Sequence, residues 1–427
     1  MHNQYCRRVA LEDHTSSLPD DILLHILSLL RLREAVATSF LSRRWRYLWT
    51  SIPKLNFELE EIFPQLDREA YIKMVNQVLK LYKGSNLHEF SIHYPLLENS
   101  SCHIDLWVAF AIATGVSRLE LNFSFDAFWK NEIIPRRYGD ESKGKTYYLL
   151  QLDRISSVLV SPLIAKNRLK SFKEIILNCV HTTDSSFETI LSACSSLERL
   201  VLFNCQKLIN AKHTGQNLKL KFLEIFICRD LENMEIFAPD LIAFKYNGPK
   251  INISLQGAQH LVNVCAISFC EVFEYPCTSY LGLPYPERKD FVFGQFAIYL
   301  SQLEHLMMDV SSFEGTRLIN EVPHFCKLKQ LSLRYFGVHP TSLCYNTATS
   351  FLKASPLLHR LELHLLPKLY PTERRARGKT IPMSPHKNLK EFLLSGFEDD
   401  EANMEFMMFI FDRAICYGTG VLAPCGT

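Results

Sequence analysis

The chain has 427 residues, of which 47% are hydrophobic and 22% charged, and its formal net charge is +2. These values are ordinary for a soluble globular protein with a large core, and they exclude a strong field that would steer the chain to nucleic acid or a membrane surface. Thirteen cysteines are scattered singly without a C-x-x-C pair, and the longest clean apolar run, 106–113, is too short to span a bilayer. We therefore expect reduced thiols, a place in the cytoplasm and/or nucleus, and neither nucleic acid nor membrane as a partner.

Residues 18–49 carry the densest pattern of the chain. Pro19 suits a first helical position, and the acidic pair Asp20 and Asp21 complements the positive end of a helix dipole. Apolar residues then follow at helical spacing: Ile22, Leu23, Ile26, Leu27 and Leu30. A later segment places Trp45, Leu48 and Trp49 at i, i+3 and i+4. So small a unit cannot bury these side chains alone, so it must pack on the rest of the chain or on a partner.

This stretch resembles the F-box, a three-helix module, and we place that domain at 14–58. The resemblance rests on the opening pattern L-P-D-[DE]-[IVL]-L-x-x-I-L and the closing pattern L-S-[KR]-R-W-R-x-L-W. It implies docking onto a Skp-family adaptor and, through it, onto a cullin–RING ubiquitin ligase. The adaptor-binding candidates by resemblance are Leu18, Pro19, Ile22, Ile26, Leu41, Trp45 and Trp49. Which Trp packs internally and which faces the adaptor stays open.

A degenerate repeat follows a helix predicted over 66–83. Its unit is L-x-x-L-x-L. Clear copies start at 197, 303, 328, 358 and 389, and weaker ones at 87, 116, 169, 220, 241 and 261. Successive starts from 197 to 261 are 23, 21 and 20 residues apart, and those from 303 to 389 are 25, 30 and 31 residues apart. These periods match or slightly exceed those of leucine-rich repeats.

Each repeat is expected to form a short strand whose second and third leucines point inward, so that stacked repeats share one core. We assign 85–365 to irregular leucine-rich repeats. Residues 124–152 and 271–295 interrupt the period and are predicted to be loops. The predicted fold class is α/β: an N-terminal three-helix F-box, then an irregular leucine-rich-repeat solenoid with a C-terminal FBD-like region.

The C-terminal part resembles the FBD region that closes many plant F-box/leucine-rich-repeat proteins. The resemblance rests on residues 354–363, 386–397 and 405–408, and we place the FBD-like region at 366–414. After Ala414 the chain departs from the family pattern, which we interpret as an alternative or truncated end. The clustered glycines of 415–427 predict a disordered tail.

Two further motifs have more than one interpretation. Residues 139–146 spell the phosphate-loop string G-x-x-x-x-G-K-T, but Pro135 argues against the buried strand that such a loop follows. We favour an exposed loop and keep nucleotide binding as an alternative.

The basic cluster 374–379 fits a nuclear address, a contact with an acidic partner or a solvated loop. No catalytic or metal-ligand pattern occurs, so no catalytic residue, cofactor or metal is expected.

The predicted function is substrate recognition in a Skp–cullin–F-box ubiquitin ligase, without chemistry of its own. A target protein of unknown identity is expected on the outward side of the repeat strands. The candidate substrate-binding residues there are Arg199, His305, Arg334, Arg360 and Glu362. Arg334 and Arg360 are predicted to occupy equivalent outward positions or to lie one step apart. The alternatives are a leucine-rich-repeat scaffold that assembles no ligase, and a P-loop nucleotide-binding protein.

Overall fold

The computed structural model describes residues 18–58, 67–124, 147–152, 155, 168–268, 291–309, 322–336, 342–366, 386–397, 408 and 419–424. The chain divides into two units, Met1–Pro135 with Gly144–Ile176 and Arg136–Lys143 with Leu177–Thr427. Each unit contains parallel strands and the helices that cover them.

The first unit begins with a small helical module. Its elements are α1 (Asp20–Ser28), α2 (Leu32–Ala37) and the 3₁₀-helices η2 (Thr38–Phe40) and η3 (Trp45–Ser51). At the start of α2, the Glu34 carboxylate accepts the Arg31 N–H at 3.1 Å. The element η3 ends at Ser51 because the next residue, Ile52, precedes Pro53 and is extended. The third helix of the predicted module is therefore a 3₁₀-helix.

The interior of this module is apolar. Its buried side chains are Leu23, Leu27, Leu32, Ala35, Trp45 and Trp49. Leu23 and Leu27 lie one turn apart on α1 and thus share a face of the helix. The two indoles, Trp45 and Trp49, are the largest side chains of this buried set.

Strands of the first unit follow in the order β1-β2-β3-β5. They are β1 (Lys54–Glu58), β2 (Glu89–His93), β3 (Arg118–Asn122) and β5 (Glu174–Asn178), the last at the division between the units. The first three are paired in parallel. Next to β3, the N–H groups of Lys173 and Glu174 donate to the Ser117 carbonyl at 2.8 and 3.0 Å.

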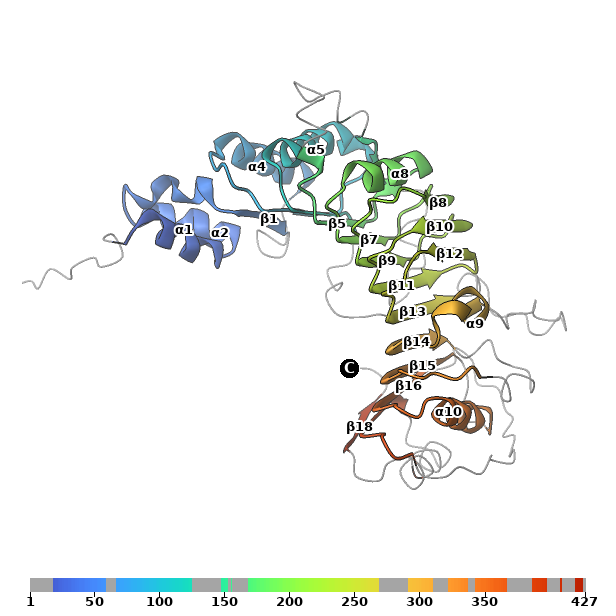
Figure 1. Ribbon diagram of the computed structural model, residues 1–427. Helices are drawn as coiled ribbons and strands as arrows, with labels where there is room; N and C mark the ends of the chain where they lie inside the picture. The colour runs from blue at the N-terminus through green and yellow to red at the C-terminus, as the bar shows by residue number, and fades with distance from the viewer. Residues whose placement is uncertain are drawn as a thin grey trace, which may run out of the picture. The chain divides into compact units, whose positions relative to one another are not determined.

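Two long helices, α4 (Arg68–Leu81) and α5 (Ser101–Thr114), cover one face of these strands (Figure 1). The helix predicted over 66–83 is confirmed as α4, which Asp67 caps by accepting the Ala70 N–H at 2.7 Å. Phe110 of α5 contacts Phe90 of β2, with ring centroids 6.0 Å apart. The covered face is therefore the core face. Residues that alternate with Phe90 along β2, such as Glu89 and Ser91, face the opposite side of the sheet.

Residues 147–152 correct part of a predicted loop. Tyr147, Tyr148 and Leu150 are buried, and Leu149–Leu150 forms the short strand β4. The Tyr148 hydroxyl donates to Asp105 Oδ1 of α5 at 2.6 Å. The segment was assigned to a loop because the residues before it are charged and it is too short to show a periodic pattern of its own.

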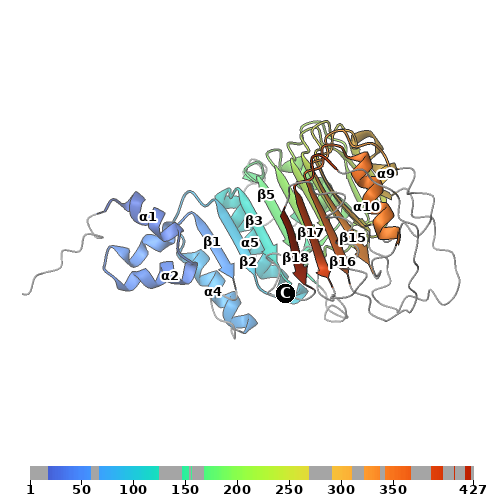
Figure 2. The same cartoon turned by 90° about the horizontal axis from the view of Figure 1, so that it is seen from below.

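Among the described residues, nine parallel strands of the second unit follow each other in chain order. They are β7 (Arg199–Phe203), β9 (Phe222–Phe226), β11 (Ala243–Gly248), β13 (Asn263–Ser268), β14 (His305–Asp309), β15 (Gln330–Phe336), β16 (Arg360–Leu366), β17 (Glu391–Phe397) and β18 (Thr419–Pro424). Figure 2 shows the last four of them, β15 to β18, side by side.

The repeat register is confirmed by where these strands begin. All eight from β7 to β17 start two residues after a predicted repeat start, and so do β2 and β3. In the same eight copies the first, fourth and sixth residues are buried. One start was wrong: β5 begins two residues after Phe172, so Phe172 takes the first position in place of Leu169.

The secondary structure of the return segment depends on the length of the repeat. The short repeats return through β8 (Asn210–His213), β10 (Asn233–Phe237) and β12 (Asn252–Gln256), which form a second parallel sheet. Helical elements described in other return segments of the second unit are α8 (Asp184–Ala193), α9 (Phe291–Gln295), η7 (Ala297–Tyr299) and α10 (Ser342–Ala354). Of these, α9 lies within residues 271–295, which were predicted to be a loop. About twenty residues leave little room for a strand, two turns and a helix.

Side chains cover both edges of this second sheet. At β12, the Gln295 side chain accepts the Ile253 N–H at 2.9 Å and donates to the Ile251 carbonyl at 3.1 Å. At β8, Asp184 Oδ1 accepts the N–H groups of Ile209 and Asn210 at 2.8 and 2.9 Å. Backbone groups that would otherwise pair with another chain are thereby satisfied.

The end of the chain corrects a second expectation. Residues 415–427 were predicted to be a disordered tail, but Thr419–Pro424 forms β18 and pairs in parallel with β17. The register shifts between Ser395 and Phe397, where Gly396 has φ +75°. A Cβ at this position would lie 1.7 Å from the Leu365 carbonyl oxygen, so only glycine fits. The outer edge of β17 accepts a further strand without the leucine pattern of the repeats.

Candidate functional site

The helical module exposes a cluster of large apolar side chains. Seven of the thirteen exposed large apolar residues in the described part of the chain lie between residues 22 and 47. They are Ile22, Ile26, Leu29, Leu30, Phe40, Leu41 and Tyr47, and we call them the apolar patch. Phe40 is the most open, with 92% of its surface exposed. Exposed apolar surface of this density marks a protein contact site.

The patch arises because α1 is apolar on two faces. Leu23 and Leu27 point into the module, while Ile22, Ile26 and Leu29 form a second stripe at i, i+4 and i+7. Ile22, Ile26 and Leu41 were predicted from the sequence to bind the adaptor, whereas Leu29, Leu30, Phe40 and Tyr47 were not. The double stripe was visible in the spacing of 22–30. Phe40 gave no periodic signal because η2 is a single 3₁₀ turn.

Five of the seven predicted adaptor-binding residues are accessible in the structure. Leu18 is half-buried, and Pro19, Ile22, Ile26 and Leu41 are exposed. Trp45 and Trp49 are the corrections, since they retain 5% and 6% of their surface and belong to the interior of the module. A buried indole supports the patch from beneath and offers no surface to a partner.

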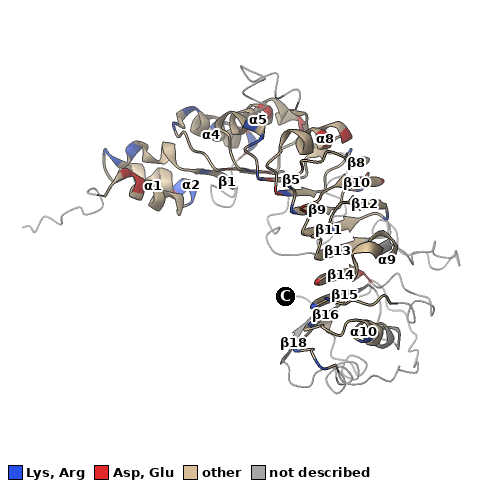
Figure 3. Cartoon of the chain, viewed as in Figure 1, with Lys and Arg blue, Asp and Glu red and all other residues tan. Residues whose placement is uncertain are grey.

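Arg44 fixes the start of α1 against the segment before η3. Its Nη2 donates to Asp20 Oδ1 and to the Leu18 carbonyl, both at 2.5 Å, and its Nε donates to Asp20 at 3.1 Å. Leu18 and Pro19 are thereby held beside the patch. Figure 3 shows the acidic residues at the start of α1 in this module.

The outward side of the second unit's strands is less open than predicted. Of the five predicted substrate-binding residues, Arg199, His305 and Arg360 are accessible, whereas Arg334 and Glu362 retain 3% and 9% of their surface. Three further residues on the outward side of these strands are also buried: Val201, Phe203 and Ser332. Burial lowers the pKa of Arg334, and the nearby Asp309 carboxylate opposes this effect.

Glu362 lies within a polar cluster on β15, β16 and β17. Arg360 Nε donates to its Oε1 at 2.6 Å, Gln330 Nε2 donates at 3.1 Å, and the Ser332 hydroxyl also donates. Burial alone raises the pKa of Glu362, but hydrogen bonds from His364, Ser332 and Arg360 outweigh it and lower the pKa to about 2. The carboxylate is therefore held ionised inside the sheet.

The strand register separates Arg334 from Arg360. Arg334 pairs with His364, whereas Arg360 pairs with Gln330, so four residues, about 13 Å, lie between them along the strands. The prediction that they sit at most one step apart was wrong. His305 lies in the row of Gln330 and Arg360, two strands from Arg360. Arg199 pairs instead with Glu224, at 2.9 Å.

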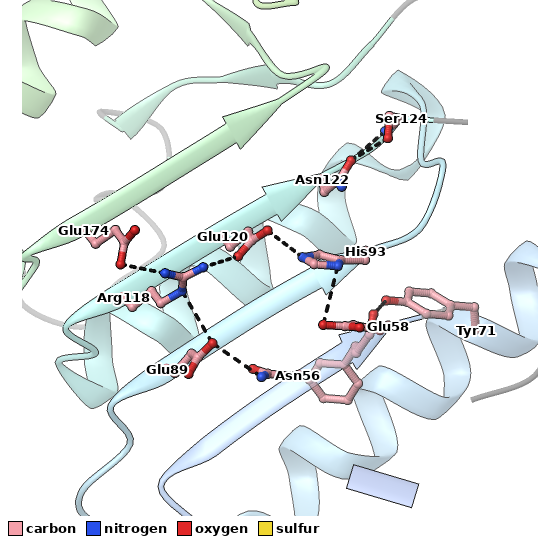
Figure 4. Close-up of polar contacts among 11 residues, drawn as sticks. Asn56, Glu58, Tyr71, Glu89, His93, Arg118, Glu120, Asn122, Ser124 and Glu174 are labelled. Carbon is pink, nitrogen blue, oxygen red and sulfur yellow. Dashed lines mark hydrogen bonds and ion pairs between the residues drawn. The ribbon is translucent and has the colours of Figure 1, made fainter. Parts of the chain in front are cut away.

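A second charged cluster, absent from the sequence analysis, lies on the outward face of the first unit (Figure 4). We call it the acidic ladder: Glu58, Glu89, Glu120 and Glu174 with Arg118 and His93. Arg118 reaches Glu174 at 2.6 Å, Glu120 at 2.7 Å and Glu89 at 3.4 Å. His93 Nε2 lies 2.9 Å from Glu120, and its Nδ1 lies 3.8 Å from Glu58. Burial raises the pKa of Glu120, but His93 and Arg118 outweigh it and lower that pKa.

Within the residues that the structure describes, no group of three or more His, Cys, Asp or Glu side chains is arranged to hold a metal ion. The same residues include no helix with the length and apolar character needed to cross a membrane. The phosphate-loop-like string 139–146 and the basic cluster 374–379 lie outside the described residues.

Comparison with known proteins agrees with this architecture. Residues 15–57 match the F-box domain model, and residues 78–417 match the model of the At1g61320/AtMIF1 LRR domain. Similar proteins from Arabidopsis thaliana include the putative F-box/LRR-repeat protein At3g18150, 28% identical over 63% of this chain and 57% of the relative. The F-box/FBD/LRR-repeat protein At2g04230 is 33% identical over 45% and 42%, and the F-box/LRR-repeat protein At3g59200 is 25% identical over 94% and 80%.

The fold and these matches define an F-box module followed by a leucine-rich-repeat solenoid. The chain belongs to the At1g61320/AtMIF1 LRR domain family and is a plant-type F-box/LRR protein, which confirms the family prediction. The match spans about half the length of the first curated relatives, at 57%, 48% and 42%. An F-box joined to leucine-rich repeats supports a substrate-receptor role in general terms.

Proposed function

We propose that this chain is the substrate receptor of a Skp–cullin–F-box ubiquitin ligase. Its F-box binds a Skp-family adaptor, and its repeats hold a target protein. The receptor performs no chemistry; it raises the concentration of the target near the ubiquitin-carrying enzyme. We place this activity in the cytoplasm and/or nucleus, which suits thirteen cysteines without a paired motif.

The apolar patch is the observation that carries this proposal. Its side chains are not needed by the interior of the module, which Leu23, Leu27 and the two indoles already fill. Burying one large apolar side chain contributes about 1.5–3 kcal/mol, so a partner that covers several of them gains a stable contact. An apolar patch around Phe40 therefore favours a protein partner at the F-box.

The test compares Phe40→Ser with the control Ile298→Ser. Ile298 is 77% exposed on η7, far along the chain from the F-box. Truncating a central anchor costs about 2 kcal/mol or more, so Phe40→Ser should weaken binding of a purified Skp-family adaptor about thirtyfold. Ile298→Ser should bind as the wild type does.

Equal affinity of both variants would remove the patch from the interface. A wild-type chain that binds no Skp-family adaptor would overturn the ligase proposal and leave the alternative, a leucine-rich-repeat scaffold.

A further inference from the structure

The segments that lead into β15, β16 and β17 carry a cluster of exposed lysines. We call this cluster the basic edge, because it lies where these three neighbouring strands begin: Lys327, Lys329, Lys353, Lys387 and Lys390. Lys329 pairs with Glu304 at 2.8 Å, and Lys327 lies near the same carboxylate. Among the described residues, no carboxylate pairs with Lys353, Lys387 or Lys390. Clustered charges of one sign attract groups of the other sign.

The register of the sheet stacks part of this cluster in one row. The His359 N–H donates to the Lys329 carbonyl, and the Lys390 N–H donates to the His359 carbonyl, both at 2.8 Å. These three residues therefore occupy equivalent positions in successive repeats. Neighbouring strands lie about 4.8 Å apart, so the backbones of Lys329 and Lys390 are about 10 Å apart.

Hydrogen bonds join the segments that carry the lysines. The Phe325 N–H donates to the Ala354 carbonyl at 2.8 Å, which joins the turn before β15 to the end of α10. His386, next to Lys387, donates from Nε2 to the Ser355 carbonyl at 2.9 Å, which joins the turn before β17 to the turn before β16. Binding at this edge does not have to order the backbone that carries the charges, which lowers its entropic cost.

One exposed apolar residue lies within the basic edge. Leu357 retains 44% of its surface and stands directly before the first leucine of its repeat. The equivalent residues of the two neighbouring repeats are Lys327 and Asn388. A partner that fits this surface therefore offers an apolar group flanked by negative charge.

This combination favours a peptide segment over other anions. A single carboxylate or phosphate balances only part of the charge of three unpaired lysines, and it makes no use of Leu357. Bases of a nucleic acid stack on aromatic side chains, whereas the large apolar side chain exposed here is a leucine. An acidic segment supplies several carboxylates and an apolar side chain together.

From these observations we propose that the basic edge binds an acidic segment of the target protein, with several Asp or Glu residues around one apolar side chain. The inference rests on the proposed receptor function and adds the chemical class of the target. The lysines attract the carboxylates, and Leu357 contacts the apolar side chain. Binding weakens as salt screens these charges.

The test uses the full-length chain and a synthetic peptide with about four glutamates around one leucine in a Gly/Ser background. Affinity is measured by fluorescence anisotropy at about 50 mM and about 300 mM salt. The variants are Lys387→Gln/Lys390→Gln, which removes two charges of the edge, and Leu357→Ser. The matched control is Lys73→Gln/Lys80→Gln on α4, since both lysines are exposed and pair with no carboxylate in the described part of the chain.

The edge variant should lose about fivefold in peptide affinity at low salt and Leu357→Ser about threefold, while the control keeps wild-type affinity. The loss in the edge variant should shrink at high salt. All substituted side chains are exposed, so the melting temperatures should stay close to that of the wild type.

Equal losses in the edge and control variants, or equal binding of a peptide with arginines in place of glutamates, would overturn the proposal. A single-stranded oligonucleotide of the same charge that binds as tightly as the peptide would also overturn it, because the attraction would then not select a protein segment.

Adaptor binding by the same preparations separates the two proposals. Peptide binding that fails while the adaptor still binds overturns the role of the basic edge alone, whereas a chain that binds peptide but no adaptor overturns the ligase proposal.

Discussion

Replacing Glu362 by Gln should make the stability of the chain depend less on pH. The folded pKa of Glu362 is about 2, below its ordinary 4.5, because hydrogen bonds from His364, Ser332 and Arg360 outweigh burial. A carboxylate with a depressed folded pKa stabilises the protein above the unfolded pKa. That contribution is lost as the pH falls from about 4.5 through about 2. A shift of this size corresponds to about 3 kcal/mol at pH 7 and about 1 kcal/mol at pH 3.

The assay is denaturant unfolding of wild type and Glu362→Gln at several pH values between about 7 and 3. The difference between the two proteins should shrink as the pH falls. Glu235→Gln is the control, because Glu235 is 41% exposed and pairs with Lys212 at the surface. Its effect should stay within about 1 kcal/mol. A gap between wild type and Glu362→Gln that is constant over this range would refute the role assigned to the charge.

Two further predictions concern the interior and the last repeats. Trp45→Ala removes an indole that is only 5% exposed, so it should lower the free energy of unfolding by about 3–5 kcal/mol. Phe40→Ser should leave the melting temperature nearly unchanged, because Phe40 is exposed. An unchanged melting temperature for Trp45→Ala would contradict the interior position of Trp45. Gly396→Ala should disrupt the pairing of β17, because the new Cβ would lie 1.7 Å from the Leu365 carbonyl oxygen. Hydrogen exchange across Glu391–Phe397 measures this effect, and undiminished protection would contradict it.

Repeat spacing predicted most of the solenoid because the signal is local. Leu197, Leu200 and Leu202 lie within six residues, and the inward alternation of a strand follows directly from that spacing. The return segments were harder to predict. Asn233–Phe237 forms a strand whose pairing partners, Asn210–His213 and Asn252–Gln256, come from neighbouring repeats. Its alternation of polar and apolar residues is too short to predict this pairing by itself.

For the F-box, the sequence determined the helices and the apolar residues but not their division between core and surface. Trp45 and Phe40 are both large and aromatic, yet one is buried and the other almost fully exposed. This division depends on how α1, α2, η2 and η3 pack together, and no spacing within a single segment contains that information.

By itself the sequence determined the family, the order of the domains and the register of nearly every repeat strand, since each depends on residues close together in the chain. The acidic ladder was decided by the tertiary structure alone. Glu58, His93 and Glu120 come from three strands separated by long connections, and parallel pairing places Glu58 beside His93 and Ser91 beside Glu120. Charges so far apart in sequence show no pattern until the register of the sheet brings them within reach of one another.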